Sequence, residues 1–219
     1  MGRRGRTYRT RALVVRWVPF SNTSQIVTVF TRDHGLVSLL AKGSLRQGRR
    51  SSSFPIPFDL AGWYDIAYRD RSTELGLATE ARLIEGFDHL RHSYDAYVEA
   101  CFGLELIRLL FRPSDPHPEF LRGALSFLKL LGVGEGHLAL RLHFATSLLR
   151  ETGVAPDWRH CAECGAPLAL DRAPERVRPP AGPVCRSCAR PNDAEVPTAV
   201  LRYLLSEQSL PWGRVPGVT

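Results

Sequence analysis

Short hydrophobic runs separated by turn-forming segments fill the amino-terminal part of the chain. Runs rich in Val, Ile, Leu and Thr lie at 11–17, 25–31 and 35–41, and the segments PFSNTS and RDHG between them carry turn chemistry. Two further candidate strands lie at 58–68 and 74–84. Five short strands predict a small closed barrel. The five-stranded OB-fold is the commonest such barrel among those that bind oligonucleotides, and an SH3-like barrel is the alternative.

From about residue 86 the apolar residues recur every three to four positions, which predicts helices. A first stripe at this spacing contains Leu90, Tyr94, Tyr97, Cys101, Leu104 and Arg108. We expect most of this stripe to be buried, with Cys101 as a structural thiol. Two further segments repeat the pattern and end in Gly132 and Gly153, each at a C-cap position. The sequence therefore predicts one helical bundle after the barrel.

Membrane and export signals are weak. No run approaches the roughly 18 apolar residues of a membrane helix, because even FGLELIRLLF contains Glu105 and Arg108. The basic start is followed by ALVVRWV, a short run that Arg16 interrupts and that leads into no small-residue cleavage pattern. We therefore expect a cytoplasmic protein without membrane contact.

Four of the five cysteines form two Cys-x-x-Cys pairs, Cys161 with Cys164 and Cys185 with Cys188. A cytoplasmic compartment keeps thiols reduced, which favours metal ligation over disulfides, and the spacing lies at the upper edge of the zinc-ribbon range. Four thiolates form a closed tetrahedral shell that selects zinc, with iron as the lesser alternative. We predict one structural Zn²⁺ per chain, with His160 at the surface rather than among the ligands.

These patterns together predict a mixed fold class, β followed by α. It consists of an amino-terminal five-stranded OB-fold barrel, a helical bundle and a four-cysteine zinc module. The predicted domain limits are 1–84 for the OB-fold, 85–156 for the helical domain with a continuation at 192–210, and 157–191 for the zinc module.

The formal net charge of +7 belongs to the amino-terminal part of the chain. Residues 1–80 contain 13 Lys or Arg and 6 Asp or Glu, whereas residues 81–219 contain 16 of each. Such a field attracts a polyanion. Only Lys42 and Lys129 are lysines, and a guanidinium suits phosphate contacts better than an ammonium group does, although a compositional bias would give the same excess of arginine.

We predict that the DNA-binding residues lie in the basic tail, on the first strand and in a mobile basic loop after the third strand. They are Arg3, Arg4, Arg6, Arg9, Arg11, Arg16, Lys42, Arg46, Arg49 and Arg50. Barrel aromatics can stack unpaired bases without reading sequence. The candidates are Trp17, Phe20, Phe30, Trp63 and Tyr64. Strand alternation leads us to expect at most two of these five to be exposed.

Signals for catalysis are poor. The segment GSLRQGRR has two glycines at Walker A spacing, but Arg49 and Arg50 stand where Lys and Ser or Thr must meet phosphate and magnesium. The segment GVGEGH matches only part of a dinucleotide fingerprint and follows a predicted helix instead of a strand. We therefore predict a binding protein and not an enzyme.

Three stretches resemble the RecO recombination mediators of bacteria. They are PFSNTSQIVTVFTRDHGLVSLLAKGSLR, LELIRLL and LLRETGVAPDWRHCAECG, and the resemblance spans residues 8–205. It implies a protein at the nucleoid that binds single- and double-stranded DNA, anneals complementary strands and works with RecR to load RecA on DNA coated by single-strand-binding protein. A zinc-stabilised OB-fold protein that binds structured RNA would show the same charge and cysteine pattern.

The resemblance also implies that the acidic tail of single-strand-binding protein docks on the helical domain. Such a tail needs a hydrophobic pocket rimmed by arginine. The arginines beside the apolar stripes of the predicted helices are Arg91, Arg108, Arg122, Arg141 and Arg150.

Overall fold

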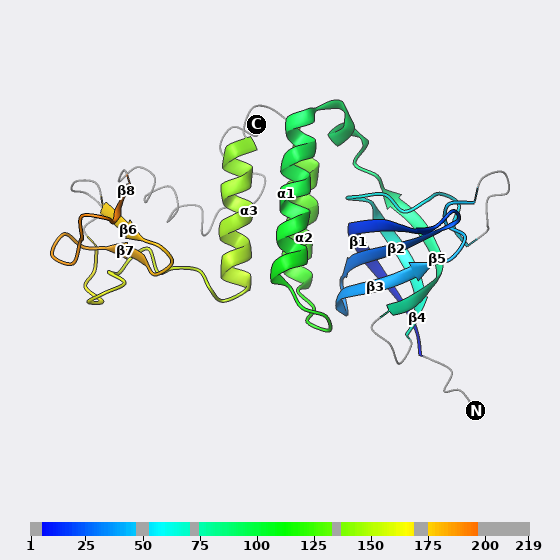
Figure 1. Cartoon of the computed structure of the whole chain (residues 1–219), viewed down its shortest axis with the longest axis horizontal. Helices are drawn as coiled ribbons and strands as arrows, with labels where there is room; N and C mark the ends of the chain where they lie inside the picture. Colours follow the sequence, from blue (N-terminus) through cyan, green and yellow to red (C-terminus); the bar gives the residue numbers. More distant parts are fainter. Residues whose placement is uncertain (1–5, 47–52, 71–74, 133–136, 169–174, 197–219) are drawn as a thin grey trace.

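A barrel, a layer of helices and a small sheet lie in a row along the longest axis of the molecule, with the helices in the middle (Figure 1). The computed structural model describes the residues in the ranges 6–46, 53–70, 75–132, 137–168 and 175–196. No helix in these ranges is long and apolar enough to cross a membrane.

Five strands form the barrel: β1 (Thr7–Ser21), β2 (Ser24–Thr31), β3 (Gly35–Ala41), β4 (Trp63–Arg69) and β5 (Leu75–Glu85). They close in the order β1-β2-β3-β5-β4, and only β3 and β5 run parallel. Alternate residues such as Val14, Val29 and Ile66 fill the interior. The expected OB-like barrel is confirmed, and the parallel pair distinguishes it from a simple meander.

The strand predicted at 58–68 begins only at Trp63. Ala61 has a left-handed φ of 62°, which a regular strand does not accommodate. The turn is instead held against β1, because the N–H of Ala61 donates to the carbonyl of Val14 over 3.0 Å and the N–H of Val14 donates to Gly62 over 2.9 Å. Residues 61–62 therefore stay hydrogen-bonded to β1 although they do not belong to β4.

The helices are η1 (Asp88–His92), α1 (Tyr94–Leu110), α2 (Pro118–Leu130) and α3 (His137–Glu151). Ser93 caps α1, since its hydroxyl accepts from the N–H of Ala96 over 3.3 Å. Gly132 and Gly153 have φ of 84° and 74°, so both predicted C-cap glycines are confirmed.

The expectation that most of the predicted stripe is buried is wrong, because only Leu90 and Leu104 are buried. Tyr94 is 81% exposed, Tyr97 is 44% exposed and Cys101 is only half-buried. The buried positions are Ala96, Glu99, Ala100, Gly103, Leu104 and Ile107. Small residues line this face because aromatic rings of α2 and α3 approach it closely. Large apolar side chains therefore do not mark the buried face of α1.

One hydrophobic core joins the helices to the outer face of the barrel. Phe30 of β2 stacks on Phe111 with ring centroids 4.9 Å apart, and Phe111 lies 4.9 Å from Phe120 of α2. The contact continues to Phe144 of α3 at 5.5 Å. Backbone hydrogen bonds reinforce it, since the N–H of Ser114 donates to the carbonyl of His34 over 3.2 Å. The barrel and helices are therefore packed as one unit.

A second, three-stranded sheet contains β6 (Glu175–Arg178), β7 (Gly182–Val184) and β8 (Ala194–Val196), in the order β7-β6-β8. Residues 194–196, which the sequence predicts as part of the helical continuation, pair with β6. The rest of that continuation, 197–210, lies outside the described residues. The domain limits stay a prediction.

Replacing Gly103 by alanine tests the close packing of α1. Alanine favours a helix by up to about 1 kcal/mol over glycine, but its Cβ would lie 2.8 Å from a ring atom of Phe127. We expect the variant to have a lower free energy of unfolding. At a separation under 3.0 Å the packed ring must shift, and overpacking costs about 1–3 kcal/mol. Urea unfolding measures the change. Leu109→Ala is the control, since Leu109 lies on the same helix and is 60% exposed. A more stable Gly103→Ala variant would contradict this packing.

Candidate nucleic-acid surface and metal centre

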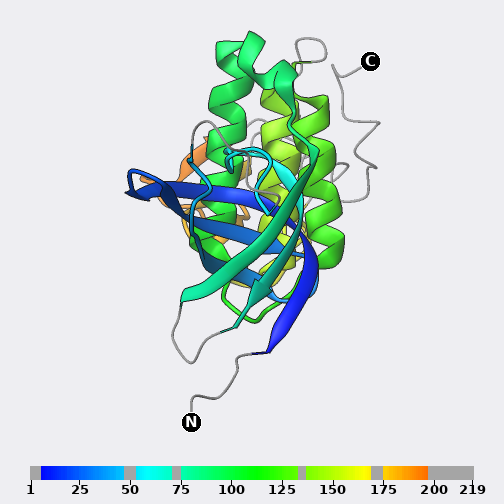
Figure 2. The ribbon, with the colours of Figure 1, turned by 90° about the vertical axis from the view of Figure 1, so that its right-hand side faces the viewer.

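The turn between β1 and β2 projects from one side of the barrel (Figure 2). Near this turn Trp17 is 38% exposed and Phe20 is 58% exposed. The other three candidate aromatics, Phe30, Trp63 and Tyr64, are buried. The expectation of at most two exposed rings is therefore confirmed, and both lie at the end of β1.

A basic loop lies beside this hairpin. The N–H of Leu45 donates to the carbonyl of Thr23 over 3.0 Å, and the N–H of Gly43 donates to the hydroxyl of Ser24 over 3.2 Å. These bonds hold Lys42 and Arg46 next to the turn that carries Phe20. Exposed rings and cations thus occupy one end of the barrel.

Gln25 fixes this arrangement from inside. Its side chain is buried, its amide nitrogen donates to the carbonyl of Phe58 over 2.9 Å, and its amide oxygen accepts from the N–H of Phe58 over 3.1 Å. The same oxygen accepts from the hydroxyl of Ser44 over 2.9 Å. One amide therefore ties the basic loop to the segment before β4 that contains Phe58. Gln25 is not among the residues predicted from the sequence, although a polar residue at an inward strand position is a readable signal.

The other predicted DNA-binding residues are spread over the barrel. Arg9 lies at the opposite end of β1 and donates to the carboxylate of Asp65 over 3.0 Å, with Glu80 at 3.6 Å. The hydrogen bond with Asp65 raises the pKa of Arg9, and the two acids offset its charge. Arg6 lies 5.4 Å above the ring of Tyr8.

Arg11 and Arg16 are exposed on β1. Arg3, Arg4, Arg49 and Arg50 lie outside the described residues. Of the predicted positions that the structure describes, Lys42 and Arg46 lie in the loop that is hydrogen-bonded to the β1–β2 turn, and Arg16 lines a pocket together with Trp17. The assignment of the full set to DNA stays a prediction.

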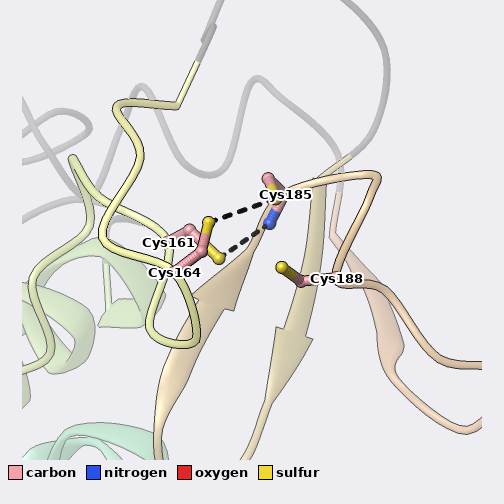
Figure 3. Close-up of side chains that lie close together, drawn as sticks. All are labelled: Cys161, Cys164, Cys185 and Cys188. Atoms are coloured by element: carbon pink, nitrogen blue, oxygen red, sulfur yellow. Dashed lines mark hydrogen bonds between the residues drawn. The ribbon is translucent and has the colours of Figure 1, made fainter.

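The four paired cysteines converge between the loop after α3 and the loop after β7 (Figure 3). Their sulfur atoms all lie within 4.8 Å of one another, and the sulfurs of Cys164 and Cys185 are 3.8 Å apart. Zinc–sulfur bonds of about 2.3 Å in a tetrahedron place sulfurs about 3.8 Å apart. The donor set and its spacing therefore fit a metal ion. His160 lies outside the cluster and its ring contacts Asp157 at 2.8 Å.

The thiols of the cluster differ in acidity. Burial opposes ionisation of Cys161, but the N–H groups of Cys164, Cys185 and Glu163 point at its sulfur and lower its pKa to about 6. The pKa of Cys188 is raised to about 12, because the neighbouring sulfurs of Cys185 and Cys164 hold its proton. Thiolates repel one another in so small a space, and a divalent cation relieves that repulsion by taking all four as ligands.

Arg178 of β6 connects the two cysteine turns. Its guanidinium donates to Glu163, between Cys161 and Cys164, over 2.5 Å and to the carbonyl of Cys188 over 2.9 Å. It also donates twice to Asp193, over 2.9 and 3.0 Å. These bonds, with the N–H of Arg190, lower the pKa of Asp193 to about 2. One arginine thus fixes both turns relative to the sheet.

Comparisons with known proteins agree with this architecture. Residues 5–87 match the family model described as Recombination protein O N terminal, and residues 91–218 match Recombination protein O C terminal. A DNA repair protein RecO of Rhodopirellula baltica is 35% identical over 91% of this chain and 76% of its own length. Another from Rubrobacter xylanophilus is 31% identical over 93% of this chain and 82% of its own length. With both halves matched in order, the chain belongs to the RecO family of DNA repair proteins.

Proposed function

We propose that this protein binds single- and double-stranded DNA, anneals complementary strands and helps to load RecA, together with RecR, on DNA coated by single-strand-binding protein. The proposal is carried by one observation. The exposed rings of Trp17 and Phe20 lie at the same end of the barrel as Lys42 and Arg46. Because the proposed ligand is DNA, we place the protein in the cytoplasm, at the nucleoid.

Annealing needs no bond chemistry, so the proposal requires no catalytic group. Two complementary strands repel each other through their phosphates, and a surface rich in cations lowers this repulsion by displacing counterions. Exposed rings hold unpaired bases without selecting a sequence, because every base has a π-face. A protein with both features can present one strand to another whatever their sequence.

We propose the partner proteins because the chain belongs to the RecO family. A tail of single-strand-binding protein that docks on the helices would meet arginines that already have partners. Arg91 pairs with Asp59, Arg122 with Glu119 and Arg141 with Glu99. Docking of an acidic tail would therefore exchange existing ion pairs, and we expect it to weaken as salt rises.

Binding to structured RNA is the alternative function, since stacking and phosphate contacts serve either nucleic acid. Competition between DNA and RNA oligonucleotides of the same sequence separates the two. Preferential displacement of bound DNA by RNA would favour the RNA function.

We propose further that the four cysteines hold one structural Zn²⁺. The ion supplies a fixed tetrahedral link between the two cysteine turns, and four thiolates leave no position for a reacting water. Cys161, Cys164, Cys185 and Cys188 would be its ligands, with Arg178 orienting the backbone around them.

Replacing Lys42 and Arg46 together by glutamine should weaken binding to all single-stranded sequences alike and slow annealing. The slope of log affinity against log salt should fall by about 1.4, because each phosphate contact contributes about 0.7 on single strands. Anisotropy of a labelled oligonucleotide at several salt concentrations measures the slope. Arg9→Gln should lower it less, since Asp65 and Glu80 offset that charge. An unchanged slope in the double variant would move the phosphate contacts elsewhere.

Replacing Phe20 by alanine should weaken binding to single strands by about 1–3 kcal/mol, the usual contribution of one stacked base. Duplex binding should change little, because paired bases are not available for stacking. The salt slope should stay the same, since no charge is removed. Phe20→Trp, which keeps a ring, should retain affinity in the same anisotropy assay. Equal losses on single strands and duplex would argue against a stacking role.

Purified reduced protein should contain about one zinc per chain, as a closed tetrahedral shell requires. Cys164→Ser should lower the zinc content and the melting temperature more than the DNA affinity of the folded fraction. Elemental analysis with thermal unfolding measures both. Arg178→Gln should release zinc to a chelator faster, whereas Arg159→Gln, on an exposed residue of the same loop, should not. Wild-type protein free of zinc and iron would refute the proposal.

A further inference from the structure

A polar cleft lies where the outer face of the barrel meets the end of α1. Its volume is about 740 Å³, within the range of ligand-binding clefts. Residues from β1, β2, β3, β4, α1 and the loop at 113–114 line it. The cleft is therefore built by the barrel and the helices together.

A β-bulge turns Arg16 into this cleft. The pairing of β1 with β2 shifts between Val14 and Arg16, and the extra residue, Val15, is buried in the core shared with the helices. Regular alternation would have turned Arg16 toward the barrel interior, whereas the bulge places it in register with Thr28 and Ser38. The hydroxyls of Thr28 and Ser38 are 3.5 Å apart. A cation and two hydroxyls thus form one row across three strands.

Arg108 faces the same cleft from α1. Glu105 accepts from its Nε over 2.8 Å and from its Nη2, which orients the guanidinium. Within the described part of the chain, Nη1 of Arg108 donates to no acceptor. Arg16 forms no ion pair there, although Glu105, whose pKa the hydrogen bond from Arg108 lowers, is near enough for the charge of Arg16 to lower that pKa further. Two guanidiniums from different elements therefore have donors to offer to an anion.

The other end of the cleft is aromatic. Tyr8 and His34 are half-buried, with ring centroids 4.7 Å apart, and Tyr8 stacks on Tyr68 at 5.4 Å. Asp70 is the acid that lines the cleft, and it follows β4 directly after Arg69. The cations and the acid thus come from separate elements of the wall.

We propose that this cleft binds a short segment of single-stranded DNA, with its phosphates at Arg16 and Arg108 and its bases toward Tyr8 and His34. The inference deepens the proposed function, on which it rests, because annealing requires one protein to hold two strands that repel each other. The hairpin end with Phe20 and Lys42 holds one strand, and the cleft holds the second.

The lining favours a nucleotide chain over an acidic peptide. Leu36, Val37 and Phe111 make part of the wall apolar, but the hydroxyls of Thr28 and Ser38 lie in one row with Arg16. A nucleotide chain uses such a row along its backbone, whereas an acidic peptide with a hydrophobic anchor would use mainly the apolar part. Hydroxyls and guanidiniums both donate to phosphate oxygens, and aromatic rings accept an unpaired base by stacking. Arg6 already lies 5.4 Å from the centre of the Tyr8 ring, so a base stacked there would replace that contact.

The test uses Arg16→Gln, Arg108→Gln and their combination, with Lys129→Gln as the matched control. Lys129 also loses one positive charge and also pairs with an acid, Glu85 at 3.2 Å, but it lies on α2 and does not line the cleft. Each cleft variant should lower affinity for oligo-dT about threefold to tenfold and reduce the salt slope by about 0.7. The control should match the wild type in both measurements.

Co-occupancy separates the cleft from the hairpin end. Two non-complementary oligonucleotides carrying a donor and an acceptor dye should show energy transfer on the wild-type protein, which the cleft double variant should lose while it still binds one strand. If it keeps wild-type affinity and energy transfer while Lys42→Gln with Arg46→Gln weakens binding, this inference fails and the proposed function stands. If none of these variants changes DNA binding, both fail.

One conservative variant and one peptide-binding measurement complete the test. Arg16→Lys keeps the charge and should retain the salt slope, which guards against a glutamine variant that fails to fold. If the cleft variants lose an acidic peptide but keep wild-type DNA affinity, the cleft serves a protein tail and the inference is overturned.

Discussion

The burial of one outer face of the barrel beneath the helices is the constraint that shapes every other part of the structure. Phe30 of the sheet and Phe111 beyond α1 stack in a core that continues through Phe120 into the bundle. Because the helices cover this part of the face, a polymeric ligand can reach only what they leave open. The parts left open include the projecting β1–β2 hairpin with its basic loop and the cleft at the end of α1.

Total charge is a poor guide to the cations that a polyanion could reach. Arg9 and Arg91 are both exposed, yet each is paired with two carboxylates. Exposed pairs of this kind contribute little to stability, but two carboxylates around one guanidinium offset the charge that it could offer to a phosphate. Lys42, Arg46 and Arg16 are also exposed, and none of them forms an ion pair with another described residue.

The cysteine cluster bears on the stability of the small three-stranded sheet. The three-stranded sheet is small and short, and a small domain buries too little apolar surface to be stable alone. A metal ion held by the four thiols would compensate for this, because its binding free energy would be folding free energy. Arg178 assists by satisfying a carbonyl and two acids between those turns. The barrel and helices have a large apolar core and need no such link.

Local sequence patterns were sufficient to predict the strands, the helices, the cysteine centre and the family. Strand alternation, helical spacing and Cys-x-x-Cys pairs depend on neighbouring residues, so they can be read along the chain. Which faces are buried depended on the folded arrangement. Tyr94 lies outside and Gly103 inside, because ring packing between helices involves partners far along the chain. Arg16 likewise faces outward, since a one-residue bulge reverses strand alternation and leaves no mark in a hydrophobic pattern.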